Sequence, residues 1–162
     1  YDRPCSAVYQ DFHNDLYEEL TTLYDKLKRY EALHVVFNDR FQFIPNELLS
    51  GIHQFHGETQ YPITIERDFN VKNLRKGHCY MAISERDLAI ILKEMHRRSW
   101  EPHEDIGLLS FDDTPLKEVL AGGITTISTD FARMGETAAQ LITQGKTRRI
   151  ANPWVLHDRG SL

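Results

Sequence analysis

Two groups of polar residues follow apolar runs, and they carry the side chains best suited to binding a ligand. One apolar run ends at the adjacent carboxylates Asp112 and Asp113, and a second ends at the polar triplet 128–130. A carboxylate can accept hydrogen bonds from two neighbouring hydroxyl groups, which suits a polyhydroxylated ligand. Because open parallel sheets bind ligands at the carboxyl ends of their strands, these residues predict a binding cleft.

The remaining predicted strands also end in polar residues, together with one aromatic side chain. These strand-end residues are Asn38, Asp39, Asp68, Phe69, Ser84 and Glu85. Right-handed crossovers would place the ends of parallel strands on one edge of the sheet. An aromatic ring among hydrogen-bond acceptors can cover the apolar face of a sugar-like ligand.

Strands and helices alternate along the chain, which predicts an α/β domain with a parallel sheet and helices on both faces. The expected strands are 6–9, 33–37, 63–65, 79–83, 106–111 and 124–127. The expected helices are 14–30, 45–56, one that starts at Ser84, 115–120 and 131–144. The segment 150–156 is expected to be extended, and Pro153 restricts it to a sheet edge or a crossing segment.

Local signals mark the ends of these helices, because capping residues and glycines occur at fixed positions relative to them. The signals are Asn14 and Asp113 as caps, a capping box of Ser84 with Asp87, and Gly57 and Gly145 as stops.

Composition sets further bounds on the chain. Its 162 residues fit one domain with a real core, and the net charge of −5 argues against binding nucleic acid by itself. Cys79 is expected to be a buried thiol, and its distance from Cys5 leaves a disulfide possible but unneeded, a pattern that suits a reducing compartment. No apolar stretch is long enough to span a membrane, and no signal peptide is expected. The start at Tyr1 predicts that the chain is part of a longer protein.

Three kinds of chemistry find weak support. His53 and His56 share the i, i+3 spacing of metal ligands, but no third ligand is spaced to join them, so no metal site is predicted. Ser110 and Ser128 lack a nucleophile-elbow motif and a positioned base. The glycine patterns of dinucleotide and nucleoside-triphosphate sites are missing, and no cofactor is expected.

The order of FDDTP, GITTIS and TDFARMG resembles the effector domain of the LacI/GalR family of bacterial transcription regulators. YDRP at the start and RGSL at the end resemble the family's boundary motifs, so the resemblance covers nearly the whole chain. The forms TPLKEVLAGGITTISTDF and ERDL are similar to a subgroup of Bacteroidetes regulators that carry a GntR-type winged-helix DNA-binding domain.

The resemblance implies a type I periplasmic-binding-protein-like fold, of which this chain holds the second lobe. Residues 1–130 would form that lobe, with 1–12 crossing from a first lobe that is absent; 146–162 would form an extended tail. The helix 131–145 would pack on the absent first lobe, and the DNA-binding domain is absent too. We expect the apolar face of this helix to bury against a second copy or to fold back onto the lobe.

The resemblance also implies which residues contact the effector. Asp112 matches a family carboxylate that binds ligand hydroxyls, Phe69 an aromatic that covers the ligand, and Glu85 a position often held by asparagine. Asn38 joins them as a strand-end candidate. Leu48 stands where many members have an arginine that grips the effector, which favours a neutral carbohydrate over a phosphorylated sugar.

The sequence therefore predicts a cytoplasmic, non-enzymatic, ligand-sensing domain of a transcription regulator. Its expected partners are a small-molecule effector, a second copy of the chain, and DNA only through the absent domain, without a membrane. The main alternative is a periplasmic solute-binding protein of a sugar transporter. A doubly wound enzyme is a weaker alternative, because it would need a nucleophile or base in the cleft.

Overall fold

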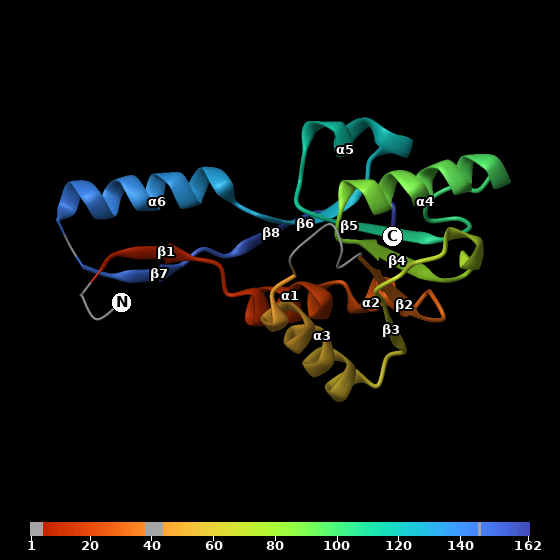
Figure 1. Ribbon diagram of the computed structural model, residues 1–162, viewed down its shortest axis with the longest axis horizontal. Coiled ribbons are helices and arrows are strands. Elements are labelled where there is room, and N and C mark those ends of the chain that lie inside the picture. Colours follow the sequence, from red (N-terminus) through yellow and green to blue (C-terminus); the bar gives the residue numbers. More distant parts are fainter. Residues whose placement is uncertain (1–4, 38–43, 146) are drawn as a thin grey trace.

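A computed structural model describes residues 5–37, 44–145 and 147–162, and it contains two sheets (Figure 1). The strands of the larger sheet are β2 (Leu33–Val36), β3 (Ile63–Glu66), β4 (Cys79–Ala82), β5 (Gly107–Phe111), β6 (Thr125–Thr129) and β8 (Trp154–His157). Their order is β3-β2-β4-β5-β6-β8, and all neighbours pair in parallel except β6 and β8. The predicted parallel α/β sheet is confirmed, and β8, the segment with Pro153 before it, lies at an edge.

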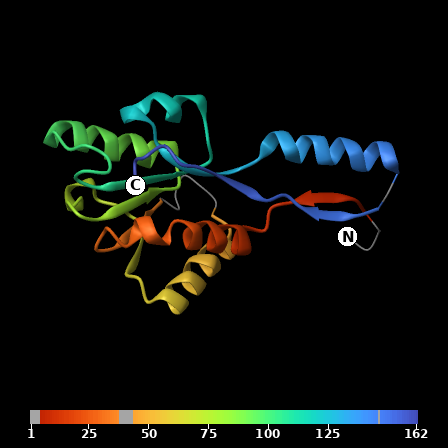
Figure 2. The ribbon, with the colours of Figure 1, turned by 180° about the vertical axis from the view of Figure 1, so that it is seen from behind.

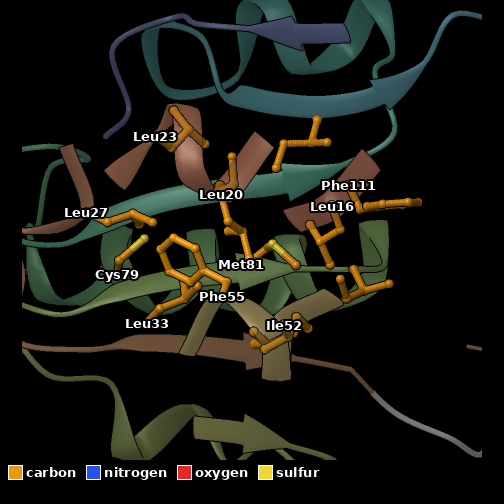
Figure 3. Close-up of a cluster of buried hydrophobic side chains, with 14 of the residues drawn as sticks. Leu16, Leu20, Leu23, Leu27, Leu33, Ile52, Phe55, Cys79, Met81 and Phe111 are labelled. Carbon is orange, nitrogen blue, oxygen red and sulfur yellow. The ribbon is translucent and has the colours of Figure 1, made fainter. Parts of the chain in front are cut away.

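Helices cover both faces of this sheet. These are α1 (Phe12–Thr22), α2 (Tyr24–Leu27) and α3 (Asn46–Thr59) on one side, and α4 (Glu85–Arg98) and the short α5 (Pro115–Val119) on the other, with 3₁₀ turns at Val71–Asn73 and Leu120–Gly122. The core between the sheet and the helices α1 and α3 contains leucines of α1 together with Phe55, Met81 and Phe111 (Figure 3). A second core lies under α4, around Leu88, Ile91 and Tyr80. Both faces are apolar because a parallel sheet buries both of them.

A smaller unit projects from this body. It consists of β1 (Ala7–Tyr9), β7 (Arg149–Ala151) and α6 (Phe131–Gln144), and we call it the arm (Figures 1 and 2). The strands β1 and β7 pair in parallel, and α6 packs on β1.

Three segments of the chain connect the arm to the body, and they are tied to one another where they cross. Gln10 donates a side-chain hydrogen bond to Thr129, Asn152 N–H donates to the Tyr9 carbonyl at 2.8 Å, and Asn152 Nδ2 donates to the Asp130 carbonyl at 3.1 Å. The chain thus passes between the arm and the body at three neighbouring places.

Several helix ends agree with their sequence signals. Ser84 Oγ accepts the Asp87 N–H, which confirms Ser84 as the N-cap of α4. The Asp87 carboxylate accepts from the Ser84 hydroxyl at 2.6 Å, so the two predicted partners are paired through their side chains. The helix α6 spans the predicted 131–144 and ends at Gly145 in the left-handed conformation, φ +61. Such ends are set by a few neighbouring residues, which is why the sequence predicts them.

Two other helix ends differ from the prediction. The helix expected from Asn14 begins at Phe12, because Asp11 caps it by accepting the Asn14 N–H. That helix is also interrupted at Leu23, which lies between the end of α1 and the start of α2. Gly57 lies inside α3, which continues to Thr59 and ends with Gln60 in the left-handed conformation.

The helices α1 and α3 approach each other closely at Gly51. A Cβ atom at this position would lie 2.5 Å from the His13 carbonyl oxygen, closer than such atoms normally come. The absence of a side chain is therefore what lets the two helices meet at this distance.

The apolar side of α6 is only partly covered within one chain. Leu141 is buried, but Phe131 is 58% exposed and Ile142 is 80% exposed. The helix does not fold back onto the six-stranded sheet, so that expectation is wrong for the single chain. Burial against a second copy stays a prediction.

Cys79 is fully buried, as predicted, and burial raises the pKa of its thiol. Cys5 is exposed, and both cysteines are free thiols. In the described ranges, no helix is long and apolar enough to cross a membrane.

Candidate functional site

A cleft lies at the carboxyl edge of the six-stranded sheet, made of two adjoining cavities of about 330 and 450 Å³. The residues shared by both are Ile83, Phe111, Asp112 and Phe131. The smaller cavity is also lined by Gln10, Phe12, Ile44, Pro45 and Leu48. The larger is also lined by Ser84, Glu85, Asp113, Thr114 and Lys117.

Asp112 stands in the middle of this cleft, where β5 ends. Its backbone is left-handed, with φ +56, and its N–H donates to the Ile127 carbonyl at 2.9 Å. Its half-buried carboxylate accepts no hydrogen bond from the residues that the structure describes. Burial raises the pKa of Asp112, and the nearby Lys117 ammonium opposes part of that rise. A half-buried acceptor without a donor is one that ligand hydroxyl groups can satisfy.

Glu85 lies in the first turn of α4 and lines the larger cavity together with Asp112. Its side chain is exposed, so it is open to a ligand that enters from solvent. The structure thus brings two of the predicted site residues into one cleft. Asp87, two positions later, is paired with Ser84 at the start of α4, as predicted.

Asp113 has a structural role that the sequence did not predict. Arg159 donates to both of its carboxylate oxygens, at 2.7 and 2.9 Å, and Thr126 donates to one of them at 2.8 Å. The Arg159 guanidinium holds the pKa of Asp113 at about 2. The prediction that Asp113 caps the helix at 115–120 is wrong, because Thr114 takes that position and no side chain caps α5.

The other two predicted site residues are not part of the cleft as described. Phe69 lines neither cavity; it is half-buried and packs against Tyr80, with ring centroids 6.0 Å apart. Asn38 lies outside the described residues. Ligand contact by either residue stays a prediction.

Leu48, which stands where the family resemblance predicts an arginine, lines the cleft. It is 2% exposed and packs in the core beside α1. Among the described residues that line the two cavities, none is an arginine. The chemistry of this wall is therefore apolar and does not favour an acidic ligand group.

Sequence reasoning missed two cleft residues. Lys117 is only 2% exposed, and its Nζ donates to the Phe111 and Asp112 carbonyls at 2.7 Å each. Burial lowers the pKa of Lys117. Thr114 Oγ1 is hidden from solvent and has no hydrogen-bond partner within the described part of the chain. No periodicity distinguishes a buried lysine from an exposed one, so neither role had a local signal.

The two histidines considered as metal ligands are exposed on α3. His56 Nδ1 lies 2.7 Å from the Tyr61 carbonyl oxygen, so its ring interacts with the chain just beyond its own helix. Across residues 5–37, 44–145 and 147–162, no group of three acidic, histidine or cysteine side chains is placed to hold a metal ion.

Comparison with solved structures finds the same fold in bacterial regulators. An Escherichia coli transcriptional repressor, ascG, is 15% identical in sequence, and the two structures superpose with a TM-score of 0.75. The match covers 96% of this chain and 63% of the repressor chain. A LacI-family regulator from an Arthrobacter species, in complex with lactose, is 14% identical with a TM-score of 0.76. That match covers 97% of this chain and 66% of the regulator chain. A ribose operon repressor from Lactobacillus acidophilus is 16% identical with a TM-score of 0.74, and the match covers 99% of this chain and 66% of the repressor chain.

The chain spans only 60 to 66% of the length of such structures. No curated protein matches the sequence. Residues 51–160 match the family described as periplasmic binding protein-like domain, and this region includes Asp112, Glu85 and most of the six-stranded sheet. By this match and by its fold, the chain belongs to the family of periplasmic-binding-protein-like domains.

Proposed function

We propose that this chain is the ligand-sensing lobe of a transcription regulator and that it binds a sugar in the cleft around Asp112. The observation that carries this proposal is the half-buried Asp112 carboxylate, which no described residue satisfies and which shares a cavity with Glu85. The apolar Leu48, which lines the smaller cavity together with Asp112, favours a neutral carbohydrate over a phosphorylated one.

The names of the similar structures support a regulator more than a transport protein, because the three cited above are repressors or regulators. On this proposal the protein is cytoplasmic and binds its effector without chemical turnover. The further assignment to the GntR-fused Bacteroidetes subgroup rests on the sequence forms around Thr114 and Asp87.

The longer protein would contain a first lobe, which would pack against α6 and close the cleft from the other side, and a DNA-binding domain. Effector binding would favour the closed arrangement of the lobes, and the changed geometry of a homodimer would alter DNA binding. A sugar with equal affinity for both arrangements would leave DNA binding unchanged.

The test is a thermal-shift screen of the 162-residue chain, and of the longer protein, against neutral monosaccharides and disaccharides. Asp112→Asn removes the charge at nearly constant size. Asp25→Asn is the matched control, because the Asp25 side chain is 92% exposed, pairs with Lys28 and lines neither cavity of the cleft. We expect at least one sugar to stabilise the protein and this effect to be lost in Asp112→Asn alone.

Stabilisation that survives Asp112→Asn would remove the site from this cleft. Failure of every sugar with a well-folded longer protein would overturn the sugar class. The regulator assignment has its own test, which is selection of DNA from a random pool by the longer protein. Enrichment of one sequence, with binding changed by the sugar, supports it, and failure to enrich any sequence contradicts it.

A further inference from the structure

We propose that Lys117 is the positioning residue of the cleft: its buried ammonium holds the turn at Asp112, and so sets where the Asp112 carboxylate meets a ligand. This inference rests on the proposed function for the role of Asp112, but the contacts of Lys117 are independent of it. The ammonium donates to two consecutive carbonyls, Phe111 and Asp112, at 2.7 Å each.

These two contacts require a bent chain. Consecutive carbonyls of a strand point in opposite directions, so a single ammonium can reach both only where the strand has turned between them. The turn is the left-handed backbone of Asp112, φ +56, a conformation that residues other than glycine seldom adopt. Lys117 therefore stabilises the conformation in which Asp112 leaves the line of β5.

Stability alone gives a weak reason for a lysine here. A buried ammonium loses its hydration, and an apolar side chain of similar length would fill the same space without that loss. Lys117 is nevertheless 2% exposed, and it is the one cation that lines either cavity of the cleft among the described residues. Its two hydrogen bonds to the main chain at Asp112 indicate that it serves the carboxylate rather than the core.

The ammonium also affects the charge of Asp112. Burial favours the neutral carboxylic acid, and the positive charge of Lys117 favours the ionised form. The ionised form is the better acceptor for ligand hydroxyl groups. Because Lys117 is 2% exposed and its ammonium donates to the main chain at Asp112, its role in the proposal is to act through Asp112.

The experiment compares Lys117→Met with Lys93→Met in the 162-residue chain. Methionine keeps the approximate length of lysine and removes the charge and donors. Lys93 is the matched control because it lies on the neighbouring helix α4 and is exposed, and it contacts neither carbonyl. Two NMR readouts are needed: the strong intraresidue amide-to-Hα contact that marks the positive φ of Asp112, and the carboxyl titration of the same residue.

We expect Lys117→Met to weaken the positive-φ signal and to raise the pKa of Asp112 further, while Lys93→Met leaves both unchanged. Lys117→Met should also weaken, at least tenfold and more strongly at lower pH, the binding of any sugar found in the thermal-shift screen. An unchanged φ signal and an unchanged Asp112 titration in folded Lys117→Met would overturn the proposal.

A measurement on the unmodified chain covers the case in which Lys117→Met does not fold. The Lys117 ammonium should give slowly exchanging NMR signals with couplings to the carbonyl carbons of residues 111 and 112. Their absence would overturn the proposal as well. Because none of these signals needs a ligand, failure of the sugar screen would count against the proposed function, and the positioning of the Asp112 turn by Lys117 would still be decided by the NMR signals.

Discussion

The two terminal nitrogens of Arg159 donate hydrogen bonds to the two carboxylate oxygens of Asp113, at 2.7 and 2.9 Å. The two residues are 46 positions apart in the sequence. Both side chains are 17% exposed, so the pair is shielded from most of the solvent. This contact fastens the segment after β8 to the turn after β5, beside the cleft. Among the described residues, none donates a hydrogen bond to the neighbouring Asp112 carboxylate, so the two adjacent aspartates have different surroundings.

Asp113→Asn should lower the free energy of unfolding at pH 7 by about 2 kcal/mol, because it replaces an ionic pair by a weaker neutral contact. The pKa of Asp113 is lowered to about 2 in the folded state. The contribution of Asp113 to the free energy of unfolding is therefore fully present above its pKa in the unfolded chain, which is about 4, and it is lost as the pH falls towards 2. Urea unfolding of both proteins at several pH values measures this.

The difference between Asp113→Asn and the unmodified chain should shrink as the pH approaches 2. Asp25→Asn serves as the control, since its exposed pair with Lys28 should contribute little. A difference that stays constant from pH 7 to pH 2 would contradict the assigned role of the ionised Asp113.

His78 should make the fold less stable as the pH falls from 7 to 5. Burial, and then the nearby His34, lower the pKa of His78 in the folded state. The unfolded chain therefore binds a proton at a higher pH than the folded chain does. The free energy of unfolding is highest above the pKa that His78 has in the unfolded chain, and it decreases as the pH falls below that pKa. The groups around its ring are His34 at 2.9 Å, Glu31 at 3.4 Å and Arg75.

Replacing this side chain tests the effect directly. His78→Gln should flatten the dependence of the melting temperature on pH between 7 and 5. His53→Gln, at an exposed position of α3, should leave it unchanged. An equally steep dependence in His78→Gln would show that another group is responsible.

Gly51→Ala should destabilise the fold by about 1–3 kcal/mol, because the added methyl group would press on the His13 carbonyl 2.5 Å away. Gly57→Ala is the matched control in the same helix. A Cβ atom there meets nothing within 4 Å, so the better helix propensity of alanine should stabilise by about 0.5–1 kcal/mol. Opposite signs in chemical denaturation support the close packing of α1 and α3, and equal signs contradict it.

Ile142→Glu should reduce self-association of the chain if the uncovered side of α6 packs on a second copy. Ile142 is 80% exposed, and such a side chain is expected to be covered in an assembly. Light scattering over a concentration series gives the average mass. Val119→Glu, at a 73% exposed position on α5, is the control; a mass lowered by that variant instead would place the interface on α5.

The fold was largely predictable because its signals are local. The apolar runs that became β4, β5 and β6 are continuous, and the two ends of α6 are set by Asp130 and Gly145. The first helix shows the limit of such signals. Asp11 and Asn14 are both good caps, and only the three-dimensional path of the chain before the helix decides between them.

The site was predictable in part. A strand that ends in two carboxylates points to the cleft, but nothing local distinguishes Asp112 from Asp113. Their roles are separated by Arg159, which is distant in sequence, and by Lys117, which a pattern of polarity assigns to the solvent. Phe69 shows the converse, because an aromatic at a strand end is equally suited to packing on Tyr80.

The pairing of β1 with β7 has a consequence for the order of folding. Ala7 is paired with Arg149, so the arm cannot form its sheet until most of the chain has been made and brought together. Closing so long a loop costs entropy before any contact compensates for it, and a parallel pair of strands compensates slowly. The body, with its nearer contacts, is therefore expected to form first, and the arm to be the last and the most easily undone part of the molecule.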